Sequence, residues 1–321
     1  MHNISELQKI IETAIPNIAY PAHPKNLYEP IKYIMNLGGK RLRPALVLLA
    51  ADMFNGEVEK ALPAALAIET FHNFTLIHDD IMDNAPLRRG QTTVHEKWGT
   101  NNAILSGDVM MVEANKQLAQ VDSALLKEVL NTFNATAQGV CEGQQLDMEF
   151  ETRDDVSIPE YIDMIRLKTA VLVGGALKLG AIIAHASTEH AALIYEFGEN
   201  LGIAFQLQDD ILDVYGDPAK FGKQVGGDII SNKKTFLLLS LQQRLTTADQ
   251  GILDEQFLNQ TDSKVKNVTN LYNQYQIREL ATEEMQSYLV KAFNALKQIN
   301  IPAEQKEQLI ALANELMNRE S

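Results

Sequence analysis

Apolar side chains recur along most of this chain at intervals of three and four residues, the spacing that places them on one face of a helix. The alternation of apolar and polar residues that is typical of strands is hard to find. The periodicity predicts helices over residues 44–53, 62–83, 103–118 and 196–214, and amphipathic helices with charged outer faces return from Thr235 onward. The pattern therefore predicts an all-α fold.

Three local signals indicate where elements begin and end. Ser157-Ile158-Pro159-Glu160 is a capping box with proline in the first turn, and it predicts a helix that runs through Lys168. Tyr215-Gly216-Asp217-Pro218 is a helix stop, and residues 221–228 are rich in glycine and polar, which predicts a loop. No linker rich in serine and proline and no low-complexity tract interrupts the chain, so we expect one domain over residues 1–321.

Composition narrows the class of protein. With 45% hydrophobic and 22% charged residues, the chain of 321 residues resembles an ordinary soluble globular protein. Its 42 acidic and 28 basic residues give a net charge of −14, which argues against a nucleic-acid partner. Cys141 is the only cysteine, so an internal disulfide is excluded and a reducing compartment is favoured. The first residues lack the pattern of a signal peptide, and the apolar stretch 171–184 is too short to span a bilayer. We therefore expect a cytoplasmic protein without a membrane span.

Two aspartate triplets of the same design carry most of the chemical information. Asp79-Asp80-Ile81-Met82-Asp83 and Asp209-Asp210-Ile211-Leu212-Asp213 each follow an apolar run. On a helix, the first and last aspartate of each triplet share a face. Carboxylates beside a buried helical run are costly unless a cation neutralises them, and Mg²⁺ favours carboxylates together with substrate phosphates. One such triplet alone is also typical of a solvated acidic surface. A second copy in an equally apolar setting favours two opposed carboxylate faces that hold metal.

Basic residues cluster where a diphosphate would need them. Gly38-Gly39-Lys40-Arg41-Leu42-Arg43-Pro44 places three cations on a glycine turn before a helix, and Arg88-Arg89-Gly90 follows the first triplet. Glycine lets the backbone approach an anion, and the arginine fork matches phosphate oxygens. Instead of binding a diphosphate, the first segment could be a solvated loop before a helix. The second could be a surface salt-bridge patch with the neighbouring aspartates. His72 lies two helical turns before Asp79 on the same face, and a structural core histidine is the alternative there.

Further polar residues lie on or beside the later apolar helices. Lys168-Thr169 ends an otherwise apolar helical run, and Lys223 and Lys233-Lys234 bracket the glycine-rich loop after the second triplet. Gln144 and Asp147 are three positions apart, which places them on one helical face.

The order of these motifs resembles that of trans-isoprenyl diphosphate synthases in the polyprenyl synthetase family. The matching segments, from Gly38 to about Thr235, are GGKRLRP, HDDIMD with RRG, GQxLD, KT, FQLQDDILD, FGK and NKKT. The resemblance implies the isoprenoid synthase fold, a bundle of long antiparallel helices around a central active-site cavity, in a homodimer. It also implies Mg²⁺-dependent head-to-tail condensation of isopentenyl diphosphate with an allylic diphosphate, namely dimethylallyl, geranyl or farnesyl diphosphate.

The resemblance also implies roles for individual residues. Asp79, Asp83 and Asp209 would ligate three Mg²⁺ that bridge the allylic diphosphate, and Asp80, Asp210 and Asp213 would be further or water-mediated ligands. The residues that would bind the same diphosphate are Arg88, Lys168, Lys223 and Lys233. Those of the metal-free isopentenyl diphosphate site would be Lys40, Arg43, His72 and Arg89. Thr169 and Gln206 would place oxygen dipoles near the allylic cation, and Gln144 and Asp147 are further candidate substrate-binding residues.

Carbocation chemistry fits this residue set. Ionisation of an allylic C–O bond separates a cation from a diphosphate, so the main task is to stabilise the leaving anion, and cationic groups perform it. No Ser-His-Asp set or activated cysteine is evident in the sequence. We expect the departing diphosphate to accept the proton that is lost after condensation.

Product length is expected to depend on the residues just before the first triplet. In the family, positions five and four before the first aspartate help to floor the pocket, and here they are Phe74 and Thr75, with Phe71 one turn below. The bulky Phe74 resembles the short-chain members, whereas longer-chain synthases usually carry a small residue there. Geranylgeranyl diphosphate is the favoured product and farnesyl diphosphate the alternative. A purely structural role of Phe74 in the core is left open.

Two other functions compete with this interpretation. A class I terpene cyclase also ionises an allylic diphosphate, but it typically pairs one DDxxD motif with a mixed Asn/Ser/Glu motif, and Lys40, Arg43 and His72 would be redundant in it. A non-catalytic subunit of a synthase usually has degraded aspartate motifs, whereas both are intact here.

Overall fold

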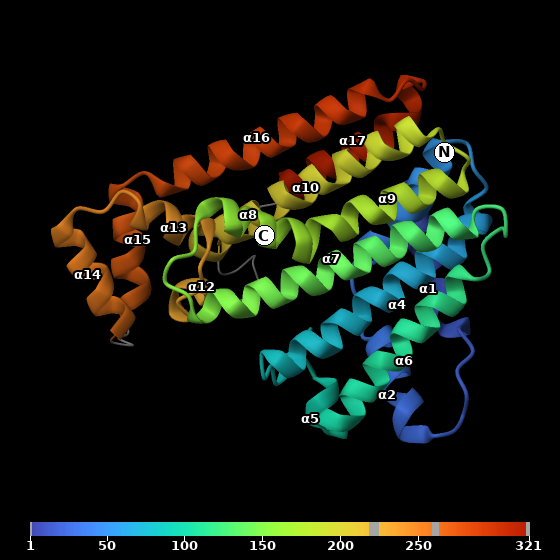
Figure 1. The fold of residues 1–321 in the computed structure, drawn as a ribbon, viewed down its shortest axis with the longest axis horizontal. Coiled ribbons are helices and arrows are strands. Elements are labelled where there is room, and N and C mark those ends of the chain that lie inside the picture. Colours follow the sequence, from blue (N-terminus) through green and yellow to red (C-terminus); the bar gives the residue numbers. More distant parts are fainter. Residues whose placement is uncertain (1, 218–224, 259–262, 319–321) are drawn as a thin grey trace. The chain divides into compact units, whose positions relative to one another are not determined.

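The computed structural model describes residues 2–217, 225–258 and 263–318, and these residues are almost entirely helical (Figure 1). In this described part, the only strands are β1 (Leu87–Arg88) and β2 (Gln91–Thr92), which form an antiparallel hairpin. The predicted all-α fold is confirmed. Among the described helices, none is both long and apolar enough to cross a membrane.

The chain divides into two compact units, which are described separately because their relative placement is not determined. Unit 1 comprises Met1–Ala137, Gly175–Ile194 and Asn300–Leu309, and unit 2 comprises Gln138–Gly174, Tyr195–Ile299 and Ile310–Ser321. Four helices contribute residues to both units: α7 (Leu126–Thr152), α9 (Val171–Ile183), α10 (Thr188–Tyr215) and α17 (Ala303–Met317). The expectation of a single domain over residues 1–321 stays a prediction.

Unit 1 is built around two strongly apolar helices. Its elements are α1 (Ile4–Ala14), η1 (Ile15–Asn17), α2 (Lys25–Asn36), α3 (Leu42–Met53), α4 (Val58–Met82), the β1–β2 hairpin, α5 (Val94–Trp98) and α6 (Thr100–Leu118). Helix α4 packs on α3 and α6, and α1 packs on α3. Residues Pro44 to Ala51 of α3 are buried on every side, as expected for a helix in the middle of a core. Gly180 of α9 lies directly on α3, since a Cβ there would be 2.1 Å from the Val47 carbonyl oxygen.

Unit 2 joins the later parts of α7 and α10 to a set of C-terminal helices. These elements are α8 (Ile158–Ile165), η2 (Arg166–Ala170), α12 (Gly227–Ile230), α13 (Phe236–Gln242), α14 (Thr247–Leu258), α15 (Lys264–Gln274) and α16 (Ile277–Gln298). Helix α13 is buried almost throughout and packs on α8 and α16. Its cluster of buried residues includes Tyr161, Leu207 and Ile229, so the core reaches the predicted site on α10.

The predicted helices are present, with shifted ends. The structure has α3, α4, α6 and α10 where periodicity predicts helices, and α10 begins at Thr188, eight residues earlier than expected. The capping box is confirmed, because Ser157 accepts from the Glu160 N–H and the Glu160 carboxylate accepts from the Ser157 N–H at 2.9 Å. The helix that begins there ends as an α-helix at Ile165, and Lys168 lies instead in a π-helical turn.

The predicted loop over residues 221–228 is partly corrected. Residues 218–224 lie outside the described residues, but a short helix, α12, already begins at Gly227. Gly226 precedes it with φ of 81°, a left-handed conformation that glycine adopts without strain. The Asp228 N–H donates to the Asp213 carboxylate at 3.0 Å, so this turn is stabilised from α10 rather than by its own sequence.

Candidate active site

The first aspartate triplet forms the C-terminal end of α4. Asp79 and Asp80 lie in the last turn, and the Asp83 N–H donates to the Asp79 carbonyl at 2.8 Å. The carbonyl end of a helix is its negative end, and the last turn of α4 contains no basic residue. Carboxylates at this position repel the helix dipole. A cation bound at the end of α4 would remove that repulsion.

Asp80 already has a cationic partner. Its side chain is 1% exposed, and Arg88 of the β1–β2 hairpin donates to it from Nε at 2.9 Å and from Nη2 at 2.7 Å. The hairpin is fixed in turn by Thr93, whose hydroxyl donates to the Ala85 carbonyl at 2.7 Å. Asp79 is half-buried and Asp83 is exposed, so these two carboxylates are the more accessible members of the triplet.

The turn before α3 has positive φ angles and is tightly held. Gly38, Gly39 and Arg41 have φ of 79°, 133° and 46°. Arg41 is buried, where it pairs with Glu69 of α4 and donates to the Met35 carbonyl at 2.6 Å. Of the three cations in the motif, Arg41 is therefore structural, while Lys40 is exposed and Arg43 half-buried.

The predicted isopentenyl diphosphate residues partly meet in unit 1. Arg89 donates to the Gly38 carbonyl, and its guanidinium packs on Gly39, where a Cβ would lie 2.7 Å from Nη1. The Arg43 Nη1 lies 3.4 Å from the His72 Nε2. Burial and the nearby arginine charges, Arg43 first, lower the pKa of His72 well below its ordinary value. His72 is therefore neutral at pH 7, and its Nε2 accepts from Arg43.

The predicted floor residues form an aromatic row on α4. The ring centroids of Phe71 and Phe74 are 5.6 Å apart, and Phe71 also contacts Phe133 of α7 at 5.5 Å. Phe71 is fully buried and Phe74 is half-buried. The Thr75 hydroxyl donates back to the His72 carbonyl at 2.8 Å, so it is engaged by its own helix.

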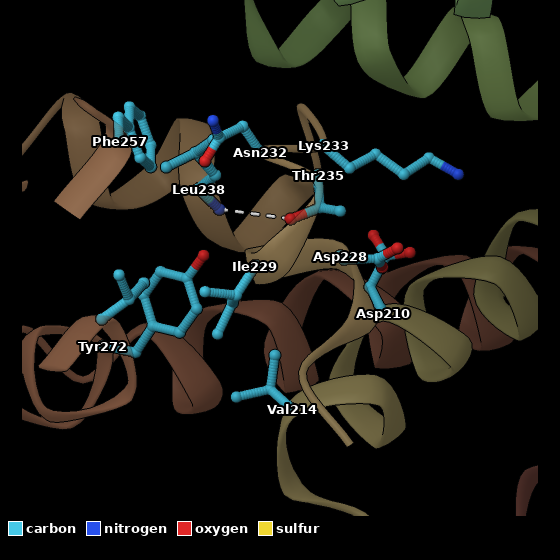
Figure 2. A pocket seen from close by; sticks show the side chains of 11 residues that line it. Asp210, Val214, Asp228, Ile229, Asn232, Lys233, Thr235, Leu238, Phe257 and Tyr272 are labelled. Atoms are coloured by element: carbon cyan, nitrogen blue, oxygen red, sulfur yellow. Dashed lines mark hydrogen bonds between the residues drawn. The ribbon is translucent and has the colours of Figure 1, made fainter. Parts of the chain in front are cut away.

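The second triplet forms the C-terminal end of α10 in unit 2. As in α4, the last turn of this helix contains no basic residue. Asp210 is buried and accepts from the Tyr161 hydroxyl of α8. Burial and the charge of Asp228 raise the pKa of Asp210 to about 7, although the Tyr161 hydroxyl and Lys233 act in the opposite direction. Figure 2 shows the Asp210 and Asp228 side chains together, with Lys233 extending beside them.

Lys168 and Thr169 are presented by the π-helical turn η2 (Arg166–Ala170). Two glycines of neighbouring helices make room for it: a Cβ on Gly143 of α7 would be 2.2 Å from the Lys168 nitrogen, and one on Gly202 of α10 would be 2.6 Å from the Ala170 Cα. π-Helical turns occur frequently at functional sites. This turn brings predicted site residues together, because Lys168 pairs with Asp147 and the Thr169 hydroxyl donates to Gln206 at 3.3 Å.

Lys233 follows a turn that a buried lysine stabilises. Lys264 of α15 is 3% exposed and donates to the Ile230 carbonyl at 3.0 Å and to the Asn232 side chain at 2.6 Å. Asn232 has φ of 55°, and the Lys233 N–H donates to the Asp228 carbonyl at 2.9 Å. Lys223, the other cation predicted in this segment, lies outside the described residues.

Sequence reasoning missed the residues that hold the candidate site in place. These are Glu69, Tyr161, Asp228 and Lys264. Asp228 lies in the glycine-rich segment that the sequence singles out, so its charge was a usable signal. The other three act on residues far away in the chain, and no local pattern reports such contacts.

The oxygen-only donor set fits a hard cation such as Mg²⁺. As they stand, the described residues form no group of three His, Cys, Asp or Glu able to hold a metal ion. Asp79 and Asp83 belong to unit 1, whereas Asp209 and Asp213 belong to unit 2. A metal site with ligands from both triplets therefore stays a prediction.

Comparisons with known proteins agree over nearly the whole chain. Residues 24–275 match the polyprenyl synthetase family. A geranylgeranyl diphosphate synthase of Methanosarcina mazei is 36% identical over 312 residues, which covers 97% of this chain and 95% of that protein. A geranylfarnesyl diphosphate synthase of Aeropyrum pernix is 35% identical over 304 residues, which covers 92% of this chain and 95% of that protein.

Solved structures give the same assignment. A crystal structure of a geranylgeranyl pyrophosphate synthase is 43% identical and covers 100% of both chains with a TM-score of 0.92. A second such structure, from Pyrococcus horikoshii, is 34% identical, covers 98% of both chains and has a TM-score of 0.91. This likeness confirms the all-α isoprenoid synthase fold. The chain belongs to the polyprenyl synthetase family of trans-prenyltransferases.

Proposed function

We propose that this protein condenses isopentenyl diphosphate head-to-tail with allylic diphosphates and that its main product is geranylgeranyl diphosphate. One observation carries the proposal: two aspartate triplets end two long helices that have no basic residue in their last turns, Arg88 pairs with Asp80 of the first triplet, and the charge of Lys233 acts on Asp210 of the second. Such an arrangement suits divalent cations together with an anionic substrate.

Asp79, Asp83 and Asp209 are the residues we propose for direct contact with Mg²⁺, of which three are expected per site. Asp80, Asp210 and Asp213 would bind it further out or through water. When bound, Mg²⁺ supplies Lewis-acid charge for the diphosphate oxygens. The all-oxygen chemistry of these six side chains supports this choice of metal.

The chain's own cations would then orient two diphosphates. Arg88, Lys168, Lys223 and Lys233 would bind the allylic diphosphate and stabilise the charge that develops as it leaves. Lys40, Arg43, Arg89 and His72 would bind isopentenyl diphosphate without metal. A neutral His72 keeps the repulsion among the arginines from increasing. Its contact with Arg43 would hold that guanidinium in place for the substrate.

Thr169 and Gln206 would stabilise the allylic cation after the C–O bond breaks. The hydroxyl of Thr169 donates to the Gln206 side-chain oxygen, so the two oxygens are held close together. Both oxygens are negative ends of dipoles, which favours a nearby positive charge. Loss of a proton to the departing diphosphate would then give the new allylic product. Gln144 and Asp147 are proposed as further substrate-binding residues, Asp147 through its pair with Lys168.

Product length is proposed to depend on Phe74, with Phe71 and Thr75 beside it. The names of the relatives support geranylgeranyl diphosphate, since several are geranylgeranyl diphosphate synthases. Farnesyl diphosphate is the second candidate, because Phe71 and Phe74 place two aromatic rings below Asp79.

A homodimer formed through α6 is part of the proposal. Ile104, Leu105 and Val112 of this helix are 40%, 56% and 58% exposed, although a soluble protein usually buries such residues. Light scattering on the purified protein should therefore give twice the mass of one chain. We further propose a cytoplasmic location, since the sequence has a single cysteine, Cys141, and hence no internal disulfide, which suits a reducing compartment.

A single assay tests the function. Purified protein is incubated with Mg²⁺, labelled isopentenyl diphosphate and each allylic primer in turn, and the products are identified by mass spectrometry. Geranylgeranyl diphosphate is the expected product. Cyclic hydrocarbons would instead identify a terpene cyclase, and an inert protein that changes a partner's products would identify a non-catalytic subunit.

A further inference from the structure

His78 is wedged between α4 and the backbone of α6 in unit 1. Its Nε2 lies 3.3 Å from the Ile104 carbonyl oxygen. A carbonyl only accepts, so His78 donates this hydrogen bond from Nε2. On its other side, the imidazole meets the Phe74 ring with centroids 4.7 Å apart and an interplanar angle of 63°, a favourable edge contact.

Gly107 is what allows this position. A Cβ on Gly107 would lie 2.3 Å from Nε2 and 2.7 Å from Cδ2 of His78, and the third nearest atom, at 3.3 Å, belongs to the same ring. The three nearest atoms therefore all belong to one side chain. The imidazole rests directly on the α6 backbone and cannot move further in that direction.

The Phe74 ring is held from two sides as a result. Phe71 contacts it at 5.6 Å and is fixed itself, because it is fully buried against Phe133. His78 fills the opposite side and is backed by α6. Contacts with neighbours on two sides limit the rotamers that the half-buried Phe74 ring can adopt.

We propose that His78, seated on Gly107, is a positioning residue for Phe74 and thereby sets the length of the prenyl product. The inference rests on the proposed function and deepens it, since it names residues outside the motif positions that indicate chain length. Removal of the imidazole gives Phe74 space to turn away from the end of the growing chain. A methyl group on Gly107 pushes the imidazole towards Phe74 and has the opposite effect.

The test compares the products of four proteins by mass spectrometry with one primer and saturating isopentenyl diphosphate. H78A should raise the ratio of longer products to geranylgeranyl diphosphate by roughly tenfold, the discrimination that a methylene-sized change in an apolar pocket supports. G107A should shift the ratio towards shorter products. G251A is the matched control, because nothing lies within 4 Å of a Cβ at that helical glycine. Product ratios do not depend on the fraction of active enzyme.

The double variant H78A/G107A separates this route from a general disturbance of α6. Without the imidazole, the methyl group that G107A introduces has room, so the shortening caused by G107A should vanish. An equal shortening in both backgrounds would overturn the proposal, as would unchanged product ratios in both single variants.

A second measurement does not need activity. A crystal structure of G107A should show the His78 and Phe74 rings displaced from their wild-type positions, and an unmoved Phe74 ring would overturn the proposal. If the wild-type protein made no prenyl diphosphate, the proposed function would fail on its own. The displacement of Phe74 would still decide whether His78 positions it.

Discussion

At the scale of single residues, buried ion pairs distinguish structural cations from those available to a substrate. Arg41 and Glu69 are both buried, and Asn73 also donates to the Glu69 carboxylate at 3.0 Å. This network holds the left-handed backbone at Arg41 and hence the turn that carries Lys40. A neighbour in the same motif, Arg43, instead reaches His72.

Glu69→Ala should destabilise the fold strongly, because it leaves the Arg41 charge buried without its carboxylate. The expected loss in free energy of unfolding is about 3–5 kcal/mol, measured by urea denaturation. Glu57→Ala is the control, since the Glu57–Lys60 pair is 66% and 67% exposed and should contribute less than about 1 kcal/mol. Equal losses in the two variants would contradict a structural role of the Arg41–Glu69 pair.

At the scale of elements, hydrophobic periodicity predicts α3, α4, α6 and α10, because each buries a long apolar face. The capping box at Ser157 is equally readable, since all of its contacts are local. The π-helical turn η2 is not readable, because Gly143 and Gly202 on two other helices make room for it. For the same reason, α12 could not be predicted, as its first turn is held by Asp213.

The capping box predicts a pH-dependent contribution to stability. Hydrogen bonds from the Ser157 hydroxyl and backbone, followed by a hydrogen bond from Arg153, lower the pKa of Glu160 from 4.5 to about 2. A lowered pKa in the folded state means that the contribution is present above pH 4.5 and is lost as the pH falls towards 2. The melting temperature of E160Q should therefore lie below that of the wild type at pH 7, and the gap should become clearly smaller at pH 3.

Glu189→Gln provides the comparison, since Glu189 is an exposed acidic residue in the first turn of α10. Its melting temperature should follow the wild type at both pH values. A gap between E160Q and wild type that is the same at pH 7 and pH 3 would argue that the Glu160 charge has no part in the cap.

Lys264→Met tests whether α15 positions Lys233. The variant removes the two hydrogen bonds by which the Lys264 ammonium holds the turn at Ile230 and Asn232. The KM for the allylic substrate should therefore rise by about tenfold, which corresponds to the free energy of about one hydrogen bond to a charged group. The KM for isopentenyl diphosphate should stay unchanged. Lys266→Met is the control on an exposed position of the same helix. A parallel rise of both KM values would indicate general damage instead.

At the scale of the whole molecule, the acidic chain ends two long helices with aspartate triplets, with Arg88 beside the first and Lys233 beside the second. The sequence identifies both triplets and most of the basic residues, because these motifs are short and local. It does not reveal which of them are already paired, as Asp80 is with Arg88, since pairing depends on the folded chain. Partners such as Tyr161 and Lys264 lie beyond any local pattern.

Both triplets should be needed equally for turnover. Asp79→Ala and Asp209→Ala should each lower kcat/KM by several orders of magnitude, because each removes a proposed ligand of the metal that would stabilise the leaving diphosphate. Asp254→Asn, at an exposed position of α14, should leave kcat/KM unchanged. Near-normal turnover in either alanine variant would remove that triplet from the proposed metal site.

The most direct measurement is a crystal structure of the protein with Mn²⁺ in place of Mg²⁺ and an unreactive allylic thiodiphosphate. The anomalous scattering of Mn²⁺ then identifies each metal ion directly and distinguishes it from water. The account predicts metal ions that bridge the diphosphate oxygens and are bound by Asp79 and Asp83 of one triplet and Asp209 of the other. Metal ions bound by one triplet alone, or a diphosphate bound away from both triplets, would contradict it.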